Sequence, residues 1–345
     1  MKPISERDPS EELTPRAARR QFLNVKQKNV KASSYRAYKY PTKHFVQFCE
    51  NQGIESVGEI NSYVMETWVQ KRESEDISPA TAHQSVKLAR VFIKWCENSG
   101  LIEPGVYDRT RVPNVDETDM VSYETVPAHR ANQILDYLST YEYATRQHAL
   151  FRLMWDTACR ASGAVSLDLE DLHRDEEGDP ALDFIDRKQK GTSLKNNSKS
   201  ERRIQLTDSL YDLLHEYINL RRDDVTDEYG RNPLFTTAHG RLTRQRAYKN
   251  VVAYTRPCVY SGECPAGKDI ETCEFTKKKR AMSCPENTSL HPVRRGSITH
   301  HINKGIPKEI ISERVDVSVE VLEKHYDART KEDALKRRKE YRDLL

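Results

Sequence analysis

The sequence contains no apolar run that approaches the roughly 20 residues a membrane-spanning helix needs, so we expect no membrane segment. Residues 1–20 also lack the apolar core of a secretory signal peptide. We therefore expect an intracellular, cytoplasmic protein. In a reducing compartment its 7 cysteines are not expected to form a disulfide framework.

A strong excess of charge of either sign is also missing. The 56 Lys and Arg residues stand against 53 Asp and Glu residues, which leaves a formal net charge of +3. Such a balance does not by itself indicate a nucleic-acid binder, because that role would need basic residues gathered on one face. No internal repeat is present either, so a solenoid is not expected.

What is present predicts two domains, since 345 residues exceed the roughly 150 residues of an average domain. Residues 12–103 carry apolar residues at helical spacing, as in the capped stretch SPATAHQSVKLARVFIKWCENSG. Residues 104–127 contain three prolines and no sustained period, so we predict a linker. Residues 128–345 form the second domain, and residues 1–11 are predicted to be frayed.

The second domain reads as helices with one small β element. The segments ALDFIDR (181–187) and ERRIQL (201–206) alternate in polarity and flank a Lys-rich connection, which predicts an antiparallel hairpin. We therefore expect a mainly α protein with a small antiparallel β-sheet.

Several residues of the second domain stand out by their setting. Arg160 ends an apolar helix, Lys195 lies in the hairpin connection, His291 and Arg294 share the stretch HPVRR, and Tyr326 follows in LEKHYD. Each has an ordinary explanation when taken alone, since an Arg at a helix end pairs with the dipole and a hairpin Lys is solvated. Their order along the chain is more informative than any one of them.

This order resembles the tyrosine recombinase (phage integrase) family, and the chain is most similar to the integrase and Xer-like proteins of haloarchaea and their viruses. The matching pieces are TACRASGAVSL, the Lys before SERRIQL, HPVRRGSITHHINKGI and SVEVLEKHYD, so the resemblance spans nearly the whole chain. HPVRRGSITH follows the family pattern H-x-L-R-H-x-x-x-T-H through His291, Arg294, Thr299 and His300.

The resemblance implies a helical, SAM-like core-binding domain over residues 12–103 and a tyrosine-recombinase catalytic domain over 128–345. It implies a site-specific DNA recombinase or integrase of a mobile element or replicon, which cleaves and rejoins DNA through a 3′-phosphotyrosine. The implied partners are double-stranded DNA and further copies of the chain, a tetramer when two sites are synapsed. The protein would then be associated with the nucleoid, and its chemistry would need no cofactor.

The chemistry explains why these residue types occur together. A phosphodiester under attack gains negative charge, which two guanidinium groups can bind bidentately; the resemblance gives this role to Arg160 and Arg294. His291 would act as a base or hold the phosphate, and Lys195 would protonate the leaving 5′ oxygen. Tyr326 would be the nucleophile. Its rival Tyr341 lies in a basic tail without the HYD context.

Two positions depart from the family pattern. Gly163 stands where an acidic residue is common, and Asp316 stands where a His or Trp is usual, although a shift of one residue would place Val317 there. A carboxylate beside a scissile phosphate would repel it unless it is paired. The alternative is therefore a catalytically impaired, sequence-specific DNA-binding regulator with the same fold.

Four cysteines fall within residues 258–284 with the spacing C-x5-C-x8-C-x10-C; they are Cys258, Cys264, Cys273 and Cys284. This insertion is rich in Gly, Pro and charge and has little core in which to bury them. A tetrahedral structural zinc would explain them, although the short C-x2-C spacing of most zinc sites is absent. Reduced thiols and disulfides remain alternatives, and a zinc-binding adaptor without a DNA role is a third functional class.

Basic residues in both domains are candidates for phosphate contacts, which position a protein on DNA without specifying sequence. They are Lys31, Arg36, Lys39 and Lys43 in the first domain and Arg241, Arg244, Arg246 and Lys249 in the second.

Overall fold

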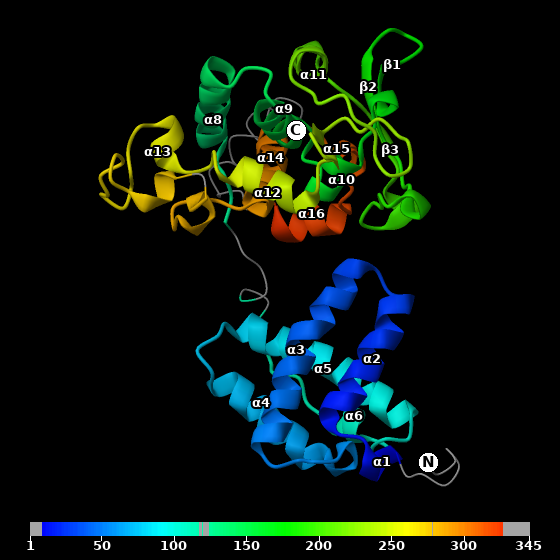
Figure 1. The fold of residues 1–345 in the computed structure, drawn as a ribbon. Coiled ribbons are helices and arrows are strands. Elements are labelled where there is room, and N and C mark those ends of the chain that lie inside the picture. Colours follow the sequence, from blue (N-terminus) through cyan, green and yellow to red (C-terminus); the bar gives the residue numbers. More distant parts are fainter. Residues whose placement is uncertain (1–8, 117–118, 120–123, 278, 327–345) are drawn as a thin grey trace, which may run out of the picture. The chain divides into compact units, whose positions relative to one another are not determined.

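A computed structural model of the chain divides into two compact units, Met1–Ser122 and Tyr123–Leu345 (Figure 1). The residues that it describes are 9–116, 119, 124–277 and 279–326. Within these residues no helix is both long enough and apolar enough to cross a membrane. Each unit has a hydrophobic core of its own.

The first unit is helical throughout its described part. Its elements are α1 (Pro9–Glu12), α2 (Pro15–Asn29), α3 (Ala32–Asn51), η2 (Val57–Glu59), α4 (Ser62–Ser74), α5 (Pro79–Asn98) and α6 (Val106–Arg109). The caps are those that the sequence predicts for α5, where the Ser78 hydroxyl accepts a hydrogen bond from the Thr81 amide. Edge-to-face aromatic pairs fill the core, including Phe45 with Trp68 at 5.1 Å between ring centroids.

Part of the predicted linker 104–127 packs into the first unit. Val106 of α6 is fully buried in its core. Farther along, Arg111 donates to the carboxylates of Glu66 and Glu73 on α4. The proline-containing stretch therefore has an irregular backbone, yet part of it packs against the first unit. Its composition alone does not indicate this packing.

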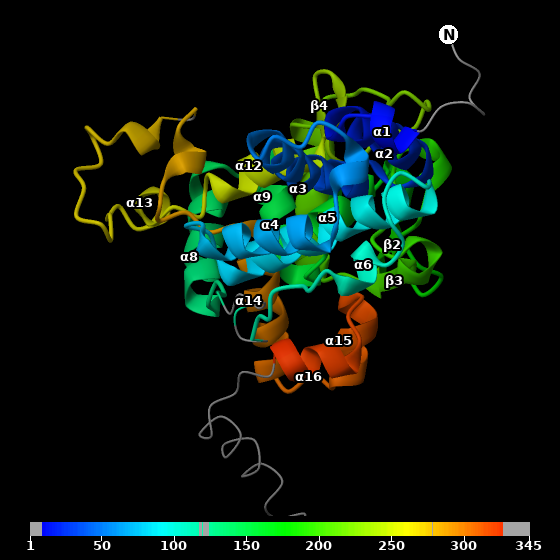
Figure 2. The ribbon, with the colours of Figure 1, turned by 90° about the horizontal axis from the view of Figure 1, so that it is seen from below.

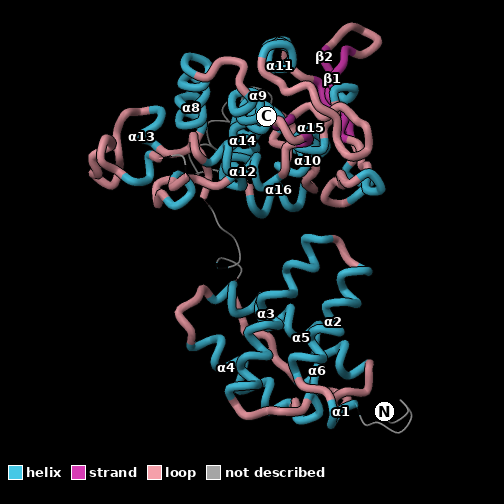
Figure 3. Tube along the Cα trace, viewed as in Figure 1, coloured by secondary structure: helices cyan, strands magenta, loops and turns pink. Residues whose placement is uncertain are grey.

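The second unit combines helices with two small sheets, shown by colour in Figure 3. Its longer helices are α8 (Ala128–Tyr141), α9 (Arg146–Thr157), α11 (Asp208–Leu220), α12 (Arg244–Val252), α14 (Leu290–Asn303), α15 (Lys308–Val315) and α16 (Val319–His325). Shorter helices are α10 (Ala161–Ser166), α13 (Pro257–Tyr260), η3 (Leu169–Asp171), η4 (Lys188–Lys190), η5 (Asn197–Ser200), η6 (Glu274–Thr276) and η7 (Ala281–Ser283). The strands are β1 (Leu172–Arg174), β2 (Pro180–Phe184), β3 (Arg202–Gln205), β4 (Thr236–Thr237) and β5 (Gly240–Arg241).

The larger sheet contains the predicted hairpin, β2 and β3, with Leu182 opposite Ile204. A third strand, β1, pairs with β2 on its other side, so that the strand order is β1-β2-β3. At three residues β1 is too short to give an alternating pattern in the sequence. The predicted fold class, mainly α with a small antiparallel sheet, is confirmed.

The main core of this unit surrounds α9, whose buried residues pack with those of α8, α11, α12 and α14. A separate, smaller cluster joins the last three described helices, which lie together in Figure 2. We call it the α14–α16 cluster; its buried members are Ala158, Ile298, Ile302, Ile311, Val315, Leu322 and Tyr326. This cluster fixes the end of α9 against the segment that carries Tyr326.

Candidate active site

Arg160 lies where α9 gives way to α10. Ala158 ends α9 in the left-handed conformation, and Arg160 then occupies the position before the first turn of α10. Its side chain is about one third exposed and forms an ion pair with the carboxylate of Asp316. A second Arg160 nitrogen, Nη2, donates to the backbone oxygen of Asp316 at 3.1 Å. Both outer nitrogens of this guanidinium therefore face one residue.

Arg294 projects from α14 and is buried, with 4% of its surface exposed. Its guanidinium donates to two backbone oxygens, that of Ala158 and, at 2.7 Å, that of Val315. Burial lowers the pKa of Arg294 to about 10, and the nearby charge of Arg160 acts in the same direction. The guanidinium stays charged at neutral pH, so the two arginines together concentrate positive charge.

His291 lies on the first turn of α14 and its side chain is exposed. Partial removal from water, followed by the charges of Arg295 and Arg294, lowers its pKa from the usual value. The imidazole is therefore held neutral near pH 7, the form that accepts a proton.

Tyr326 directly follows α16 and is 6% exposed. It packs in the α14–α16 cluster together with Ala158 and Val315, whose carbonyl groups bind Arg294. The guanidinium carbon of Arg295 lies 5.7 Å from the centre of the tyrosine ring, within the range of a cation–π contact. Arg294 thus binds backbone oxygens of two residues in the cluster that holds Tyr326, and Arg160 binds Asp316, the residue after Val315.

Lys195 lies in the turn between β2 and β3, with an exposed side chain. The end of the same connection reaches the arginines, because the Ser200 hydroxyl donates to the Asp316 carboxylate at 2.8 Å. The role of Lys195 stays a prediction, whereas Ser200 is a contact that the sequence pattern did not single out.

Arg202 was also missed. It stacks on the ring of Phe184 at 4.1 Å and donates to the backbone oxygen of Arg314 at 2.8 Å. The signal was present in ERRIQL: residues two apart on a strand share a face, so Arg202 lies on the same side as buried Ile204. Burial lowers the pKa of Arg202.

Gly163 is buried against the same aromatic ring. A Cβ atom at this position would lie 3.3 Å from the ring of Phe184, which is a tight contact. The space for the acidic residue that is common here is therefore restricted by Phe184. The other departure, Asp316, is paired with Arg160, so its charge is compensated in this structure.

The remaining histidines of the HPVRRGSITHHI stretch have structural contacts. The ring of His300 stacks on Trp155 with 5.8 Å between centroids, and Nδ1 of His301 lies 2.7 Å from the Ser297 carbonyl oxygen.

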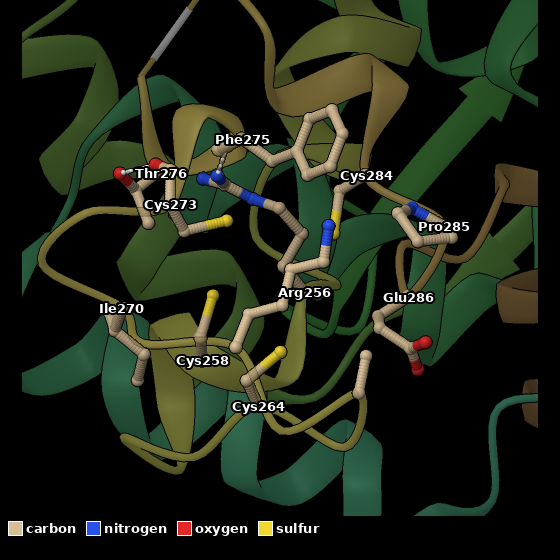
Figure 4. A pocket seen from close by; sticks show the side chains of 12 residues that line it. Arg256, Cys258, Cys264, Ile270, Cys273, Phe275, Thr276, Cys284, Pro285 and Glu286 are labelled. Carbon is tan, nitrogen blue, oxygen red and sulfur yellow. Dashed lines mark hydrogen bonds between the residues drawn. The ribbon is translucent and has the colours of Figure 1, made fainter.

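The cysteine insertion extends to one side of the second unit around α13 (Figures 1 and 2). Cys258, Cys264, Cys273 and Cys284 line one cavity of about 20 Å³, and Figure 4 shows their sulfur atoms turned toward the space they surround. We call this the thiol cavity. All four are free thiols. Among the residues that the structure describes, no three His, Cys, Asp or Glu side chains are close enough to form a metal site as they stand.

The residues around the thiol cavity change the pKa of Cys258. Burial raises the pKa of Cys258, and the neighbouring thiols of Cys284 and Cys264 raise it further, while Arg256 opposes them. Arg256 also anchors the insertion, since its side chain donates to the backbone oxygens of Ala253 and Phe275. Without a cation beside it, the Cys258 thiol therefore favours the neutral form.

The candidate DNA contacts divide into two groups. Arg241 is largely buried and pairs with the carboxylates of Asp168 and Asp227, so the expectation that it contacts DNA is wrong. Its positive charge is instead paired with these two internal carboxylates. Arg246 at the start of α12 is exposed. The other exposed candidates are Arg36, Lys39, Lys43, Arg244 and Lys249, and Lys31 is half-buried.

Residues 124–332 match the sequence model described as the phage integrase family. A probable integrase/recombinase protein of Methanocaldococcus jannaschii is 22% identical over 241 residues, covering 69% of this chain and 62% of that protein. Tyrosine recombinase XerD of Lacticaseibacillus casei is 24% identical over 190 residues, covering 53% of this chain and 58% of that protein.

The fold is similar to that of a lambda integrase dimer crystallised on a COC′ core site, with a TM-score of 0.61 and 12% identity. That match covers 96% of this chain and 82% of the integrase. The chain spans about three fifths of the length of the two curated relatives it matches.

Proposed function

Because the chain belongs to the phage integrase family, we propose that it is a site-specific tyrosine recombinase that cleaves and rejoins duplex DNA through a covalent 3′-phosphotyrosine bond. One observation carries the proposal: Arg160, Arg294 and Tyr326 meet around the end of α9 and the segment after α15. Positive charge that is held beside a tyrosine suits attack on a phosphodiester.

The bond changes follow from the proposed roles. The Tyr326 oxygen attacks phosphorus and gives its proton to neutral His291, while the bond from phosphorus to the 5′ oxygen breaks. Lys195 supplies the proton that the leaving 5′ oxygen needs. A 5′-hydroxyl of a second strand then attacks the phosphotyrosine and restores the tyrosine, so no nucleotide or metal is consumed.

The arginines would bind the charge that builds up on the non-bridging oxygens. Arg294 is suited to this because two backbone carbonyls fix its plane before DNA arrives. Loss of one preorganised donor of this kind costs about 10²–10³ in rate. The phosphate would meet a site that needs little rearrangement around Arg294.

Duplex DNA and further copies of the chain are the proposed partners. The lambda integrase was crystallised as a dimer on DNA, which supports both. We assign DNA binding to the helical first unit, as a core-binding domain over residues 12–103, and to exposed basic residues of α12 such as Arg246. A tetramer would bring two DNA sites together, and we place it in the nucleoid of the cytoplasm. Sedimentation of the protein with its DNA measures the number of copies in the complex.

A second candidate is a DNA-binding regulator without turnover. The ion pair between Asp316 and Arg160 favours it, since the pair occupies one of the two arginines that catalysis needs. The two candidates differ in covalent chemistry and not in DNA binding.

The deciding experiment incubates the protein with a nicked duplex taken from the DNA that flanks its gene. We expect a covalent protein–DNA adduct on a denaturing gel with the wild type and with Tyr341→Phe, and none with Tyr326→Phe. An adduct that survives Tyr326→Phe would remove Tyr326 from its role. Salt-sensitive binding of the duplex without any adduct would favour the regulator.

We further propose that the thiol cavity holds a structural zinc ion. Four thiols from one insertion surround one small space, and they are the ligand set of a closed, tetrahedral zinc site. Binding would draw the four sulfurs inward to about 2.3 Å from the metal. A cation there would also reverse the mutual repulsion that disfavours ionised thiols. The site would have no open position and would take no part in the chemistry.

Metal analysis of the purified protein tests this proposal. We expect about one zinc per chain in the wild type and in Cys96→Ser, since Cys96 is buried in the first unit. Cys273→Ser should lose most of the metal. Equal zinc in the wild type and Cys273→Ser, or no zinc in a protein purified without chelator, would leave the cysteines as reduced thiols or a disulfide.

A further inference from the structure

Asp316 places a carboxylate directly against the arginines of the candidate active site. It is the residue that ends α15, and its backbone takes the left-handed conformation with φ +56°. Its amide donates to the Ser312 carbonyl, which closes the helix end. The turn therefore directs the Asp316 side chain and its carbonyl group toward the same neighbour, Arg160.

The contacts of Asp316 resemble those that a phosphate would make. Its oxygen Oδ2 accepts from Nη1 of Arg160 and, at 2.8 Å, from the Ser200 hydroxyl. Its backbone oxygen accepts from Nη2 of Arg160 at 3.1 Å. Two oxygens thus receive the two arms of one guanidinium, which is the geometry in which arginine binds two oxygens of a phosphate.

The surrounding charge strengthens the comparison. Arg202 lies near enough for the charge of Asp316 to act on it, and the charges of Arg160 and Arg294 act on each other. An anion in this position relieves repulsion among the three arginines. In the protein without DNA, Asp316 supplies that anion.

Building on the proposed recombinase function, we propose that the Asp316 carboxylate occupies the place of the scissile phosphate in the DNA-free protein and is displaced when the phosphate binds. Rotation of the Asp316 side chain frees Nη1 of Arg160 for the phosphate, while Nη2 keeps its hydrogen bond to the Asp316 backbone oxygen. The Arg294 contacts do not involve Asp316 atoms and stay as they are. The exchange also frees the Ser200 hydroxyl to donate to the phosphate. Ser200 lies at the end of the β2–β3 connection that contains Lys195. Binding of the phosphate would therefore change a contact that holds this connection.

Asp316 could either compete with the phosphate for Arg160 or hold Arg160 in place for it, and Asp316→Asn has opposite effects on phosphate binding in the two cases. If Asp316 competes with phosphate, Asp316→Asn removes the competing charge and strengthens phosphate binding. If Asp316 instead holds Arg160 in a productive position, the same change weakens it. The matched control is Glu313→Gln, which removes one negative charge from the exposed face of α15. Urea unfolding of each variant checks that its second unit is intact.

The experiment titrates inorganic phosphate into the full-length protein by calorimetry, at constant ionic strength maintained with chloride. We expect Asp316→Asn to bind phosphate at least about tenfold more tightly than the wild type, a factor that corresponds to ~1.4 kcal/mol. Glu313→Gln should bind like the wild type. Adding Arg160→Gln to Asp316→Asn should abolish the gain, which locates the effect at Arg160.

Three results would overturn the proposal that the phosphate displaces Asp316. They are equal or weaker phosphate binding by Asp316→Asn, an equal gain in Glu313→Gln, and the absence of phosphate binding in every variant. The same proteins are also tested for a covalent adduct with the nicked duplex. A gain in phosphate affinity without any adduct in either protein would count against the recombinase activity and leave the displacement standing.

Discussion

The sharpest structural test concerns Gly296, in the middle of α14. A Cβ atom at this position would lie 1.8 Å from the backbone oxygen of Val126, whereas ordinary contact begins near 3.4 Å. The helix and the Val126 backbone would have to separate by about 1.6 Å to admit a methyl group. Gly296→Ala therefore forces apart two segments that the native protein holds in direct contact.

The magnitude follows from what that separation breaks. Val126 is fully buried, and its amide donates to the Pro292 carbonyl at 3.1 Å. Exposing the side chain costs about 1.5–3 kcal/mol, and the lost hydrogen bond about 1 kcal/mol. Alanine returns about 0.5–1 kcal/mol through its higher helix propensity. The steric effect wins, so we expect Gly296→Ala to lower the free energy of unfolding by about 2–3 kcal/mol.

Thermal unfolding followed by circular dichroism measures the effect. A loss of this size lowers the midpoint of a unit of this length by about 4–12 °C. Asn303→Ala, an exposed position on the same helix, should stay within about 0.5 kcal/mol of the wild type. A midpoint that rises in Gly296→Ala, as helix propensity alone would give, would refute the reasoning.

Two further predictions concern charge and pH. Arg241→Ala should cost about 1.5–3 kcal/mol of stability, because Asp168 and Asp227 lose its charged hydrogen bonds but keep Arg231 as a partner. It should not change the salt dependence of DNA binding. Arg246→Ala should lower that salt slope by about 1 and leave the urea midpoint unchanged. Burial and the charge of Arg152 lower the pKa of His148 to about 4, so stability present above pH 6.5 should be lost as the pH falls toward 4, by up to ~3 kcal/mol. Urea midpoints across this range should show the loss in the wild type and in His239→Gln and a flatter profile in His148→Gln; equal profiles in all three would disprove the assignment.

Features set by neighbouring residues could be predicted from the sequence. The helix α5 follows from a serine cap, a proline in the first turn and an apolar stripe, all within one stretch. The β2–β3 hairpin follows from two alternating segments. Family membership followed from the spacing of short motifs, although the finer resemblance to haloarchaeal proteins stays a prediction.

Features set by distant partners could not be predicted. The pairing of Asp316 with Arg160 joins residues 156 positions apart, and nothing near either residue indicates it. Arg241 looked like a DNA contact because it heads a basic stretch, yet its partners lie in other segments. The helix α6 was hidden in a proline-containing stretch because its burial depends on the rest of the first unit.

The contacts of Arg294 bear on how a protein of this kind can change over evolution. Its guanidinium joins the end of α9 to the end of α15 through two backbone oxygens, so it is part of the framework as well as the proposed phosphate ligand. A descendant that no longer cuts DNA would remain under selection to keep this arginine in order to fold. Tyr326 makes no such bridge between backbone segments among the described residues. In lineages that turn to pure DNA binding, the tyrosine should therefore be lost before Arg294.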